Sequence, residues 1–152
     1  HVSAQTIPST VKSSDVESER SAGIVGLWNV KFVSVGTPGI PDGTVIDQAY
    51  VIWHSDGTEI MNSGRPAISS NFCLGVWKQI GRSGFKLNHF AKAWDMDTGK
   101  TFVGPVNIKE DVVLNKFEDR YRGTFTLDQF DTNGNVLAHI TGKLTGARIT
   151  VD

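Results

Sequence analysis

The sequence predicts an all-β protein, a single antiparallel up-and-down β-barrel of about eight strands behind a disordered or short-helical N-terminal tail. From Gly23 onward, short runs rich in Val, Ile, Phe, Trp and Thr are separated about every ten residues by Gly, Asp, Asn and Pro. This rhythm is typical of an all-β meander. No segment shows a sustained helical period of apolar residues, which is the second observation in favour of this fold class.

The N-terminal 22 residues differ in composition from the rest of the chain. They are rich in serine and charged residues, and they lack the apolar content needed to offset the entropy of ordering. Val11, Val16 and the charges from Asp15 to Arg20 could form one helical turn, which we would expect across a barrel mouth or on a partner subunit. We therefore divide the chain into a flexible tail, 1–22, and a barrel domain, 23–152.

Turn dipeptides mark the hairpins of the barrel. Asp56-Gly57 and Asn133-Gly134 supply the positive φ conformers that tight hairpins need, and Asp97-Thr98-Gly99 and Gly81-Arg82-Ser83-Gly84 mark two more. The segments between them predict strands near 26–35, 44–55, 58–63, 73–80, 85–95, 101–113, 120–130 and 135–150.

The length of the last predicted strand favours a barrel over a β-sandwich, which stays the alternative. Gly142 and Gly146 would let this strand bend at a barrel corner where side chains would otherwise collide. Closing eight strands into a barrel also removes the exposed edges of an open sheet.

Composition excludes several classes of function. Lys plus Arg total 15 against 16 for Asp plus Glu, and these charges are scattered, so we expect no nucleic-acid partner. The apolar runs are far shorter than the roughly 20 residues that a membrane-spanning helix needs, so we expect no membrane span. Cys73 is the only cysteine, and its neighbours suggest a small buried core residue rather than a reactive thiol.

Two short motifs carry a resemblance to a known family. Gly26-Leu27-Trp28 opens the first predicted strand, Gly75-Val76-Trp77 repeats its pattern, and Arg148 lies on the last strand. The Gly-x-Trp start resembles that of lipocalin-like, or calycin, barrels. This resemblance implies that Trp28 plugs the closed end of the barrel and that Arg148 packs over it.

The region from Gly23 to Val151 is also similar to a group of small, exported, mostly uncharacterised bacterial proteins. It lacks the helix that follows the barrel in typical lipocalins and their disulfides, and it is shorter. Allene-oxide-cyclase-like barrels resemble it in size and strand rhythm. Val2-Ser3-Ala4 has the character of a signal-peptidase site, so we expect a secreted or periplasmic protein, although a cloning remnant before a polar tail explains these residues equally well.

Strand alternation yields candidate residues for the lumen. The apolar faces of the fifth and seventh strands place Leu87, His89, Tyr121 and Phe125 inside, and the sixth carries no titratable group on its inward face until Glu110. Both faces of the second strand are partly apolar, so the sequence does not decide which face points inward. If the face with Gln48, Tyr50, Ile52 and His54 points inward, these residues also line the lumen. The candidate ligand-binding residues are Gln48, Tyr50, Ile52, His54, Leu87, His89, Tyr121 and Phe125.

These residues support two functions of different classes. The first is an exported barrel that binds a small hydrophobic or aromatic molecule in its lumen, where small residues such as Ala91 and Ala93 leave space. The alternative is a cofactor-independent isomerase, cyclase or lyase in which His89, His54 or Tyr121 acts as general acid or base.

The pattern predicts neither a metal site nor a cofactor. No His-x-His, His-x-x-x-His or paired cysteine occurs, and Asp95 and Asp97 are interpreted as hairpin residues. If Trp53, Trp77 or Trp94 is exposed, it would suggest the interface of a homo-oligomer. Tryptophans in a barrel are, however, more often core residues.

Overall fold

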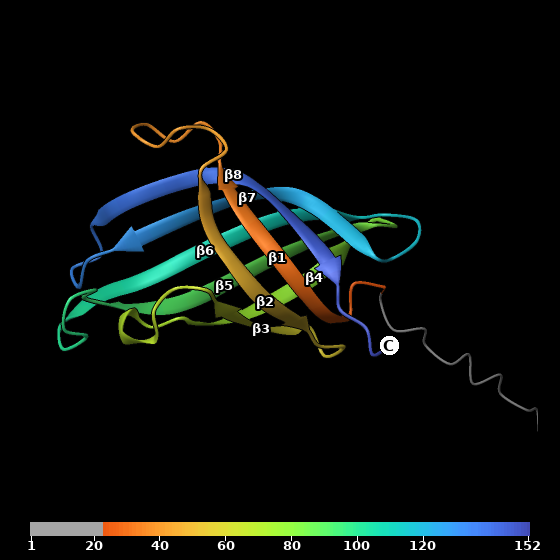
Figure 1. Ribbon diagram of the computed structural model, residues 1–152, viewed down its shortest axis with the longest axis horizontal. Helices are drawn as coiled ribbons and strands as arrows, with labels where there is room; N and C mark the ends of the chain where they lie inside the picture. The colour runs from red at the N-terminus through yellow and green to blue at the C-terminus, as the bar shows by residue number, and fades with distance from the viewer. Residues whose placement is uncertain (1–22) are drawn as a thin grey trace, which may run out of the picture.

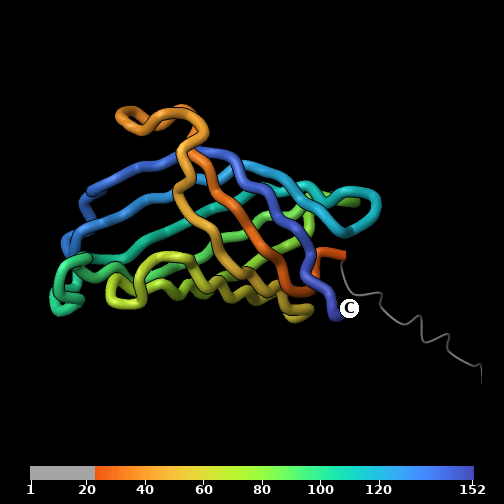
Figure 2. The backbone as a smooth tube through the Cα atoms, in the orientation of Figure 1, coloured from red at the N-terminus to blue at the C-terminus, as the bar shows by residue number. Residues whose placement is uncertain are grey.

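The computed structural model describes residues 23–152, which form an eight-stranded antiparallel barrel (Figures 1 and 2). The strands are β1 (Gly26–Ser34), β2 (Val45–Trp53), β3 (Thr58–Ser63), β4 (Phe72–Ile80), β5 (Gly84–Trp94), β6 (Phe102–Leu114), β7 (Arg120–Phe130) and β8 (Val136–Arg148). Each strand pairs with the next one along the chain, and β8 returns to pair with β1. The predicted barrel is confirmed and the sandwich alternative is wrong; the predicted tail lies outside the described residues.

The strand boundaries agree with the predicted ones to within one or two residues. Within the described part of the chain, the only helical element is a 3-10 turn, η1 (Ala67–Ser69), between β3 and β4. The predicted hairpin role of Asp95 is confirmed, because its carboxylate accepts hydrogen bonds from the backbone N–H groups of Thr98, Lys100 and Thr101. These bonds hold the pKa of Asp95 well below its usual value.

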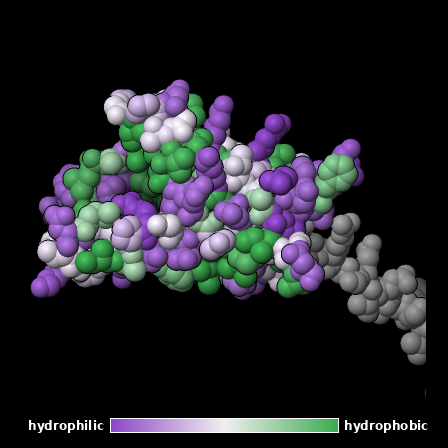
Figure 3. Space-filling view, viewed as in Figure 1, coloured by the Kyte–Doolittle hydropathy of each residue, from purple (hydrophilic) through white to green (hydrophobic). Residues whose placement is uncertain are grey.

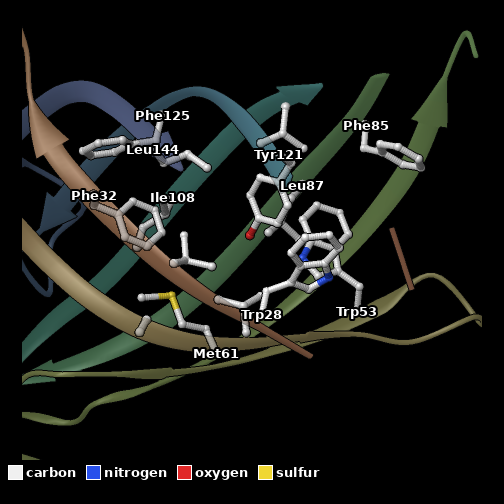
Figure 4. Packing of buried hydrophobic residues seen from close by; sticks show 14 of the residues in the cluster. Trp28, Phe32, Trp53, Met61, Phe85, Leu87, Ile108, Tyr121, Phe125 and Leu144 are labelled. Atoms are coloured by element: carbon white, nitrogen blue, oxygen red, sulfur yellow. The ribbon is translucent and has the colours of Figure 1, made fainter. Parts of the chain in front are cut away.

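One end of the barrel is filled by aromatic rings, and we call it the closed end. Trp28 and Trp53 are fully buried there, with ring centroids 4.8 and 6.1 Å from that of Tyr121 (Figure 4). The Arg148 guanidinium lies 4.2 Å from the centroid of the Trp28 ring and donates hydrogen bonds to the backbone carbonyls of Gly23, Val25 and Glu118. Both positions that the calycin resemblance implied are therefore observed.

The glycines of β8 make room for aromatic side chains of β7. A Cβ atom on Gly142 would lie 2.6 Å from the Phe125 ring, and one on Gly146 would lie 2.4 Å from the Tyr121 ring. Such approaches are too close for any side chain. The two rings can therefore reach the interior only because β8 carries glycine at both positions.

Outside the barrel, polar and apolar side chains are mixed (Figure 3). Lys86 and Lys92 point outward from β5, as its alternation predicted, while Leu74 and Phe90 remain 57% and 51% exposed. Of the tryptophans considered for an oligomer interface, Trp53 is fully buried and Trp94 is 37% exposed.

Candidate functional site

Three ionisable side chains meet inside the barrel and form what we call the polar layer: Glu59 of β3, His89 of β5 and Glu110 of β6. The Nδ1 atom of His89 lies 3.3 Å from Glu59 Oε2, and its Nε2 atom lies 3.5 Å from Glu110 Oε1. The side chains of Glu59 and His89 are completely buried, and that of Glu110 is 2% exposed. The imidazole thus stands between two carboxyl groups, away from water.

Strand alternation places these groups, and a glycine brings them together. Glu59, His89 and Glu110 each occupy an inward position in a strand whose other inward residues are buried. Gly75 of β4 pairs with both Glu59 and His89. A Cβ atom at position 75 would lie 2.4 Å from Glu59 Oε2 and 2.7 Å from His89 Cβ, so the missing side chain is what lets the carboxyl group reach the imidazole.

Burial and mutual charge shift the pKa values of this layer. Burial raises the pKa of Glu110 to about 7; the nearby His89 opposes this rise and Glu59 adds to it. For His89, burial disfavours the charged form, but the carboxyl groups of Glu59 and Glu110 outweigh it and raise the pKa. The pKa of Glu110 therefore lies near neutral pH, and its titration is coupled to that of His89, which it contacts.

Several polar atoms of this region have no hydrogen-bond partner within the described chain. Both carboxyl oxygens of Glu59, both ring nitrogens of His89 and Oε1 of Glu110 are buried without one, and so are Trp53 Nε1 and Tyr121 Oη. The two His89 contacts are longer than the usual N–H···O distance, so they are charge contacts rather than good hydrogen bonds. Each unsatisfied buried group costs about 1–3 kcal/mol, so these atoms lower the stability of the barrel rather than add to it.

A pocket opens into the barrel at the end opposite Trp28. It contains about 70 Å³ of free space. Its lining is mostly apolar and comes from seven strands and the η1 turn; the residues are Phe32, Ile46, Asp47, Met61, Ser63, Arg65, Ser69, Ser70, Cys73, Ala91, Lys92, Ala93, Trp94, Val106, Ile108, Phe125 and Leu127. We call it the lumen pocket.

The polar layer lies directly below the floor of the lumen pocket. Met61, Ala91 and Ile108 line the pocket, and the next inward residues along their strands are Glu59, His89 and Glu110. Figure 4 shows Met61 and Ile108 near Phe32, on the side of the core away from Phe85. A molecule in the pocket is therefore separated from the polar layer by one layer of side chains.

The rim of the pocket carries fixed polar groups. Asp47 accepts hydrogen bonds from the Ser63 hydroxyl, at 2.5 Å, and from the backbone N–H of Gly64. Cys73 lies in the pocket wall, where burial raises its thiol pKa to about 12, so it remains protonated and unreactive as the sequence suggested.

The structure brings four of the predicted site residues into the interior. Leu87, His89, Tyr121 and Phe125 are all buried, as the faces of β5 and β7 predicted. Of these, Phe125 lines the lumen pocket, His89 belongs to the polar layer, and Tyr121 lies with the tryptophans at the closed end. Burial raises the pKa of Tyr121 well above its usual value, and Glu110 adds to this, so its phenol stays neutral.

The residues of β2 that were predicted to line the lumen point away from it, so this prediction was wrong. Gln48 and Tyr50 are exposed, Tyr50 by 57%, and Ile52 is half-buried on the outer wall. The inward face carries Ala49, Val51 and Trp53 instead. Because both faces of β2 are partly apolar, only the packing of Trp53 against its neighbours decides which face turns inward.

His54 does not share a cavity with His89. It follows the end of β2, in the turn to β3 at the closed end, where it is half-buried. Its backbone carbonyl accepts a hydrogen bond from Trp77 Nε1 at 3.0 Å. The predicted pairing of the two histidines is therefore wrong, because His54 lies beyond the last residue of its strand.

Sequence reasoning missed Glu59 and gave Glu110 no role. Glu110 stands alone as a charge among the inward residues Val106, Ile108, Val112 and Leu114, and this isolation was a usable signal. For Glu59 the signal was weaker, since β3 has polar residues on both faces and its position depends on Gly75 in the neighbouring strand.

Among residues 23–152, no group of three or more His, Cys, Asp and Glu side chains is arranged to hold a metal ion. In the polar layer the two carboxyl groups face opposite nitrogens of one ring, so they do not converge on a single point. No helix in the described range is long and apolar enough to cross a bilayer.

Comparison with known proteins adds no relative: no protein-family model matches the chain, and the search of curated proteins finds no match. The architecture alone therefore defines the class of protein. It is a closed antiparallel barrel of eight strands with a layer of ionisable side chains below its open end.

Proposed function

We propose that the barrel binds a small, hydrophobic or aromatic molecule in the lumen pocket, with its polar end toward the polar layer. One observation carries this proposal: an open-ended, mostly apolar pocket lies directly above buried polar atoms that have no partner in the described chain. Ligand sites typically combine apolar walls with a few orienting polar groups.

The dimensions of the pocket limit the molecule. Free space of about 70 Å³ is well below the roughly 300–1,000 Å³ of sites for drug-sized ligands, so the occupant is small, slender, or only partly enclosed. Ala91 and Ala93 keep the β5 side of the pocket open, and Met61 has a flexible side chain that can adapt to a guest.

Binding is tested with a panel of uncharged probes, such as naphthalene, 2-naphthol and octanol, followed by calorimetry. Ala91→Phe fills the pocket and should weaken binding about tenfold or more, equivalent to ~1.4 kcal/mol. Thr124→Phe adds the same bulk on the exposed face of β7 and should leave binding unchanged. Equal affinity of both variants and the wild type would exclude the lumen pocket as the site.

The orienting groups are tested separately. His89→Leu removes an imidazole of the polar layer, and Tyr121→Phe removes the hydroxyl nearer the closed end. His89→Leu should weaken binding of 2-naphthol more than binding of naphthalene, because only the former has a polar group to orient. Tyr121→Phe should have the smaller effect, since Tyr121 lies two inward positions from the lining residue Phe125, whereas His89 lies one inward position from the lining residue Ala91.

A second candidate function is catalysis without a cofactor, by an isomerase, cyclase or lyase that uses His89 or Tyr121 as acid or base. The specific observation in its favour is the polar layer, since buried ionisable groups with shifted pKa values cluster at active sites. His54 drops out of this candidate site because it lies at the other end of the barrel.

Membership of the calycin group and export from the cell belong to the same proposal. Trp28 with Arg148 supports the first, and the Val2-Ser3-Ala4 stretch supports the second. Expression of the native gene with mass analysis of the cellular fractions tests export, since a processed product outside the cytoplasm is expected. A product found only in the cytoplasm contradicts it.

A further inference from the structure

We propose that one outer wall of the barrel is the interface of a homodimer, in which a second copy of this chain packs against it about a two-fold axis. This wall, which we call the β4 face, carries large apolar side chains that point outward from β2, β3, β4 and β5. The proposal concerns the outside of the barrel and does not depend on binding in the lumen pocket. The residues of the β4 face are Tyr50, Ile60, Phe72, Leu74, Val76 and Phe90.

Strand register makes the apolar side chains of the β4 face contiguous. Leu74 pairs with Ile60 on β3 and with Phe90 on β5, so one apolar row crosses three neighbouring strands (Figure 1). Phe72 and Val76 are the next outward residues on either side of Leu74 along β4. Side chains at such positions touch one another. Leu74 is therefore the centre of the face.

β4 has apolar residues on both of its faces. Its inward residues Cys73 and Gly75 are buried, and its outward residues Phe72, Leu74 and Val76 are 49%, 57% and 58% exposed. An antiparallel strand with one face in water normally alternates apolar with polar residues, whereas a strand covered on both faces is apolar throughout. The sequence of β4 is therefore that of a strand with a second layer on its outside.

In the described chain, no charged side chain stands among the outward residues that surround Leu74. The polar ones, such as Asn62 and Asn88, are neutral amides. An amide both donates and accepts hydrogen bonds, so it can pair with its own copy across a two-fold axis. Charged residues such as Lys78 occur only at the margin, where Lys86 is paired with Asp111 at 3.2 Å. An uncharged centre with a charged rim is the anatomy of a protein–protein interface.

The opposite wall of the barrel has a different character. β8 lies across the barrel from β4 in the closed ring of strands. The exposed residues of β7 and β8 include Arg120, Arg122, His139 and Lys143. The lack of charge is thus a property of one wall rather than of the whole outer surface.

The area of the β4 face fits a dimer of this chain. Side chains of this size expose up to about 150–250 Å², so the five that are about half exposed present on the order of 500 Å² of apolar surface. A standard interface buries about 800 Å² per partner, of which about 65% is apolar in homodimers, and this is nearly the same apolar area. The formal net charge of −1 gives two copies little long-range repulsion. A second copy therefore matches the face in both extent and polarity.

Self-association is measured by sedimentation equilibrium of the full chain over a concentration series from micromolar to millimolar. The mass should rise from the 16.6 kDa of one chain to twice that value and then stay constant, because a two-fold contact is closed. Leu74→Glu should weaken the dimer by about 100-fold or more, since it sets two like charges against each other at the centre of the interface.

A matched control lies on the opposite wall. Leu137 is 55% exposed on β8, so Leu137→Glu makes the same chemical change at nearly the same exposure and should dimerise like the wild type. Circular dichroism of both variants checks that the barrel is retained, as the outward position of each side chain predicts.

Charge reversal tests the two-fold arrangement itself. Leu74→Arg should be as monomeric as Leu74→Glu, but an equimolar mixture of these two variants should recover the dimer. The reason is that the centre of a two-fold contact places each substituted side chain against its counterpart, where opposite charges attract. A merely structural role of Leu74 would not produce this recovery.

The outcomes decide between a second copy and other occupants. A wild type that stays monomeric at every concentration overturns the proposal; flotation of that monomer with phosphatidylglycerol vesicles, lost in Leu74→Glu, would then assign the face to a lipid surface. A mass that rises beyond two chains, equal association of Leu74→Glu and the wild type, or a mixture of the two charged variants that remains monomeric also overturns it. None of these results changes the proposed function, which is tested inside the barrel.

Discussion

At the scale of single residues, the most informative feature is a histidine enclosed by two carboxyl groups in a barrel interior. Replacing such a buried polar cluster with apolar residues of similar volume often stabilises a protein. Here the cluster leaves polar atoms without partners in the described chain, and a glycine is placed so that Glu59 can reach His89. The residues thus favour a particular arrangement of charge over maximal stability.

The pKa shifts predict how stability changes with pH. The pKa values of Glu110 and His89 are both raised in the folded state, so the stability linked to each group is full below its unfolded pKa and is lost as pH rises through the folded value. The free energy of unfolding should therefore fall from about pH 5 to pH 8. Asp56, Asp95 and Asp131 have lowered pKa values, so their stabilisation is lost only in more acidic solution.

Glu110→Gln should flatten this decline by roughly 2–3 kcal/mol, since one pKa unit corresponds to about 1.4 kcal/mol. Urea denaturation at pH 5 and pH 8 measures it. Asp111→Asn, the exposed control on the same strand, should keep the wild-type slope. A wild-type protein that becomes more stable from pH 5 to pH 8 would contradict the assigned direction for Glu110.

Gly75→Ala should cost about 1–3 kcal/mol, the usual range for overpacking, because the new methyl group would collide with the Glu59 carboxyl and with His89. Val76→Ala, at the adjacent position that is 58% exposed, should change stability by only about 0.5 kcal/mol. Urea denaturation of both variants provides the comparison. Equal effects would mean that the close approach at Gly75 has no special importance.

At the scale of elements, side-chain contacts stabilise the seam where the first and last strands of the barrel pair. Trp28 of β1 pairs with Arg148 of β8, and the guanidinium covers the indole while it bonds to three backbone carbonyls. One side chain therefore ties the segment before β1, the β6–β7 turn and the end of β8 together.

Trp28→Ala should lower the free energy of unfolding by about 3–5 kcal/mol, because a fully buried aromatic ring is removed at the closed end. Arg148→Lys keeps the charge but loses the planar fork that reaches several carbonyls, so it should also destabilise measurably. Trp94→Ala, a 37% exposed position at the other end, serves as the control and should cost less. A nearly neutral Trp28→Ala would contradict the role of this ring as a plug.

At the scale of the whole molecule, the strand pairings that close the barrel use, among the described residues, those from Gly26 onward. All eight strand pairings lie between Gly26 and Arg148. Removal of residues 1–20 should therefore leave the thermal midpoint nearly unchanged, as their composition also predicts. Differential scanning calorimetry of the shortened and full chains tests this, and a large loss would show that the N-terminal residues contribute to stability.

Amino-acid order by itself determined the number of strands, their limits and the up-and-down connection, because turn residues and strand composition are local signals. It also determined the inward faces of β5, β6 and β7, where lysines or other polar residues oppose an apolar face. His89, Tyr121 and Phe125 could be placed on that basis.

Only the tertiary structure decided which side chains from different strands contact one another. The inward face of β2 depends on the packing of Trp53, since both faces of this strand are partly apolar. Glu59, His89 and Glu110 are far apart in the chain, and they meet because β3, β4, β5 and β6 pair in one register with a glycine between Glu59 and His89. Such contacts are set by strand register and the space around side chains, and no local pattern encodes either of them.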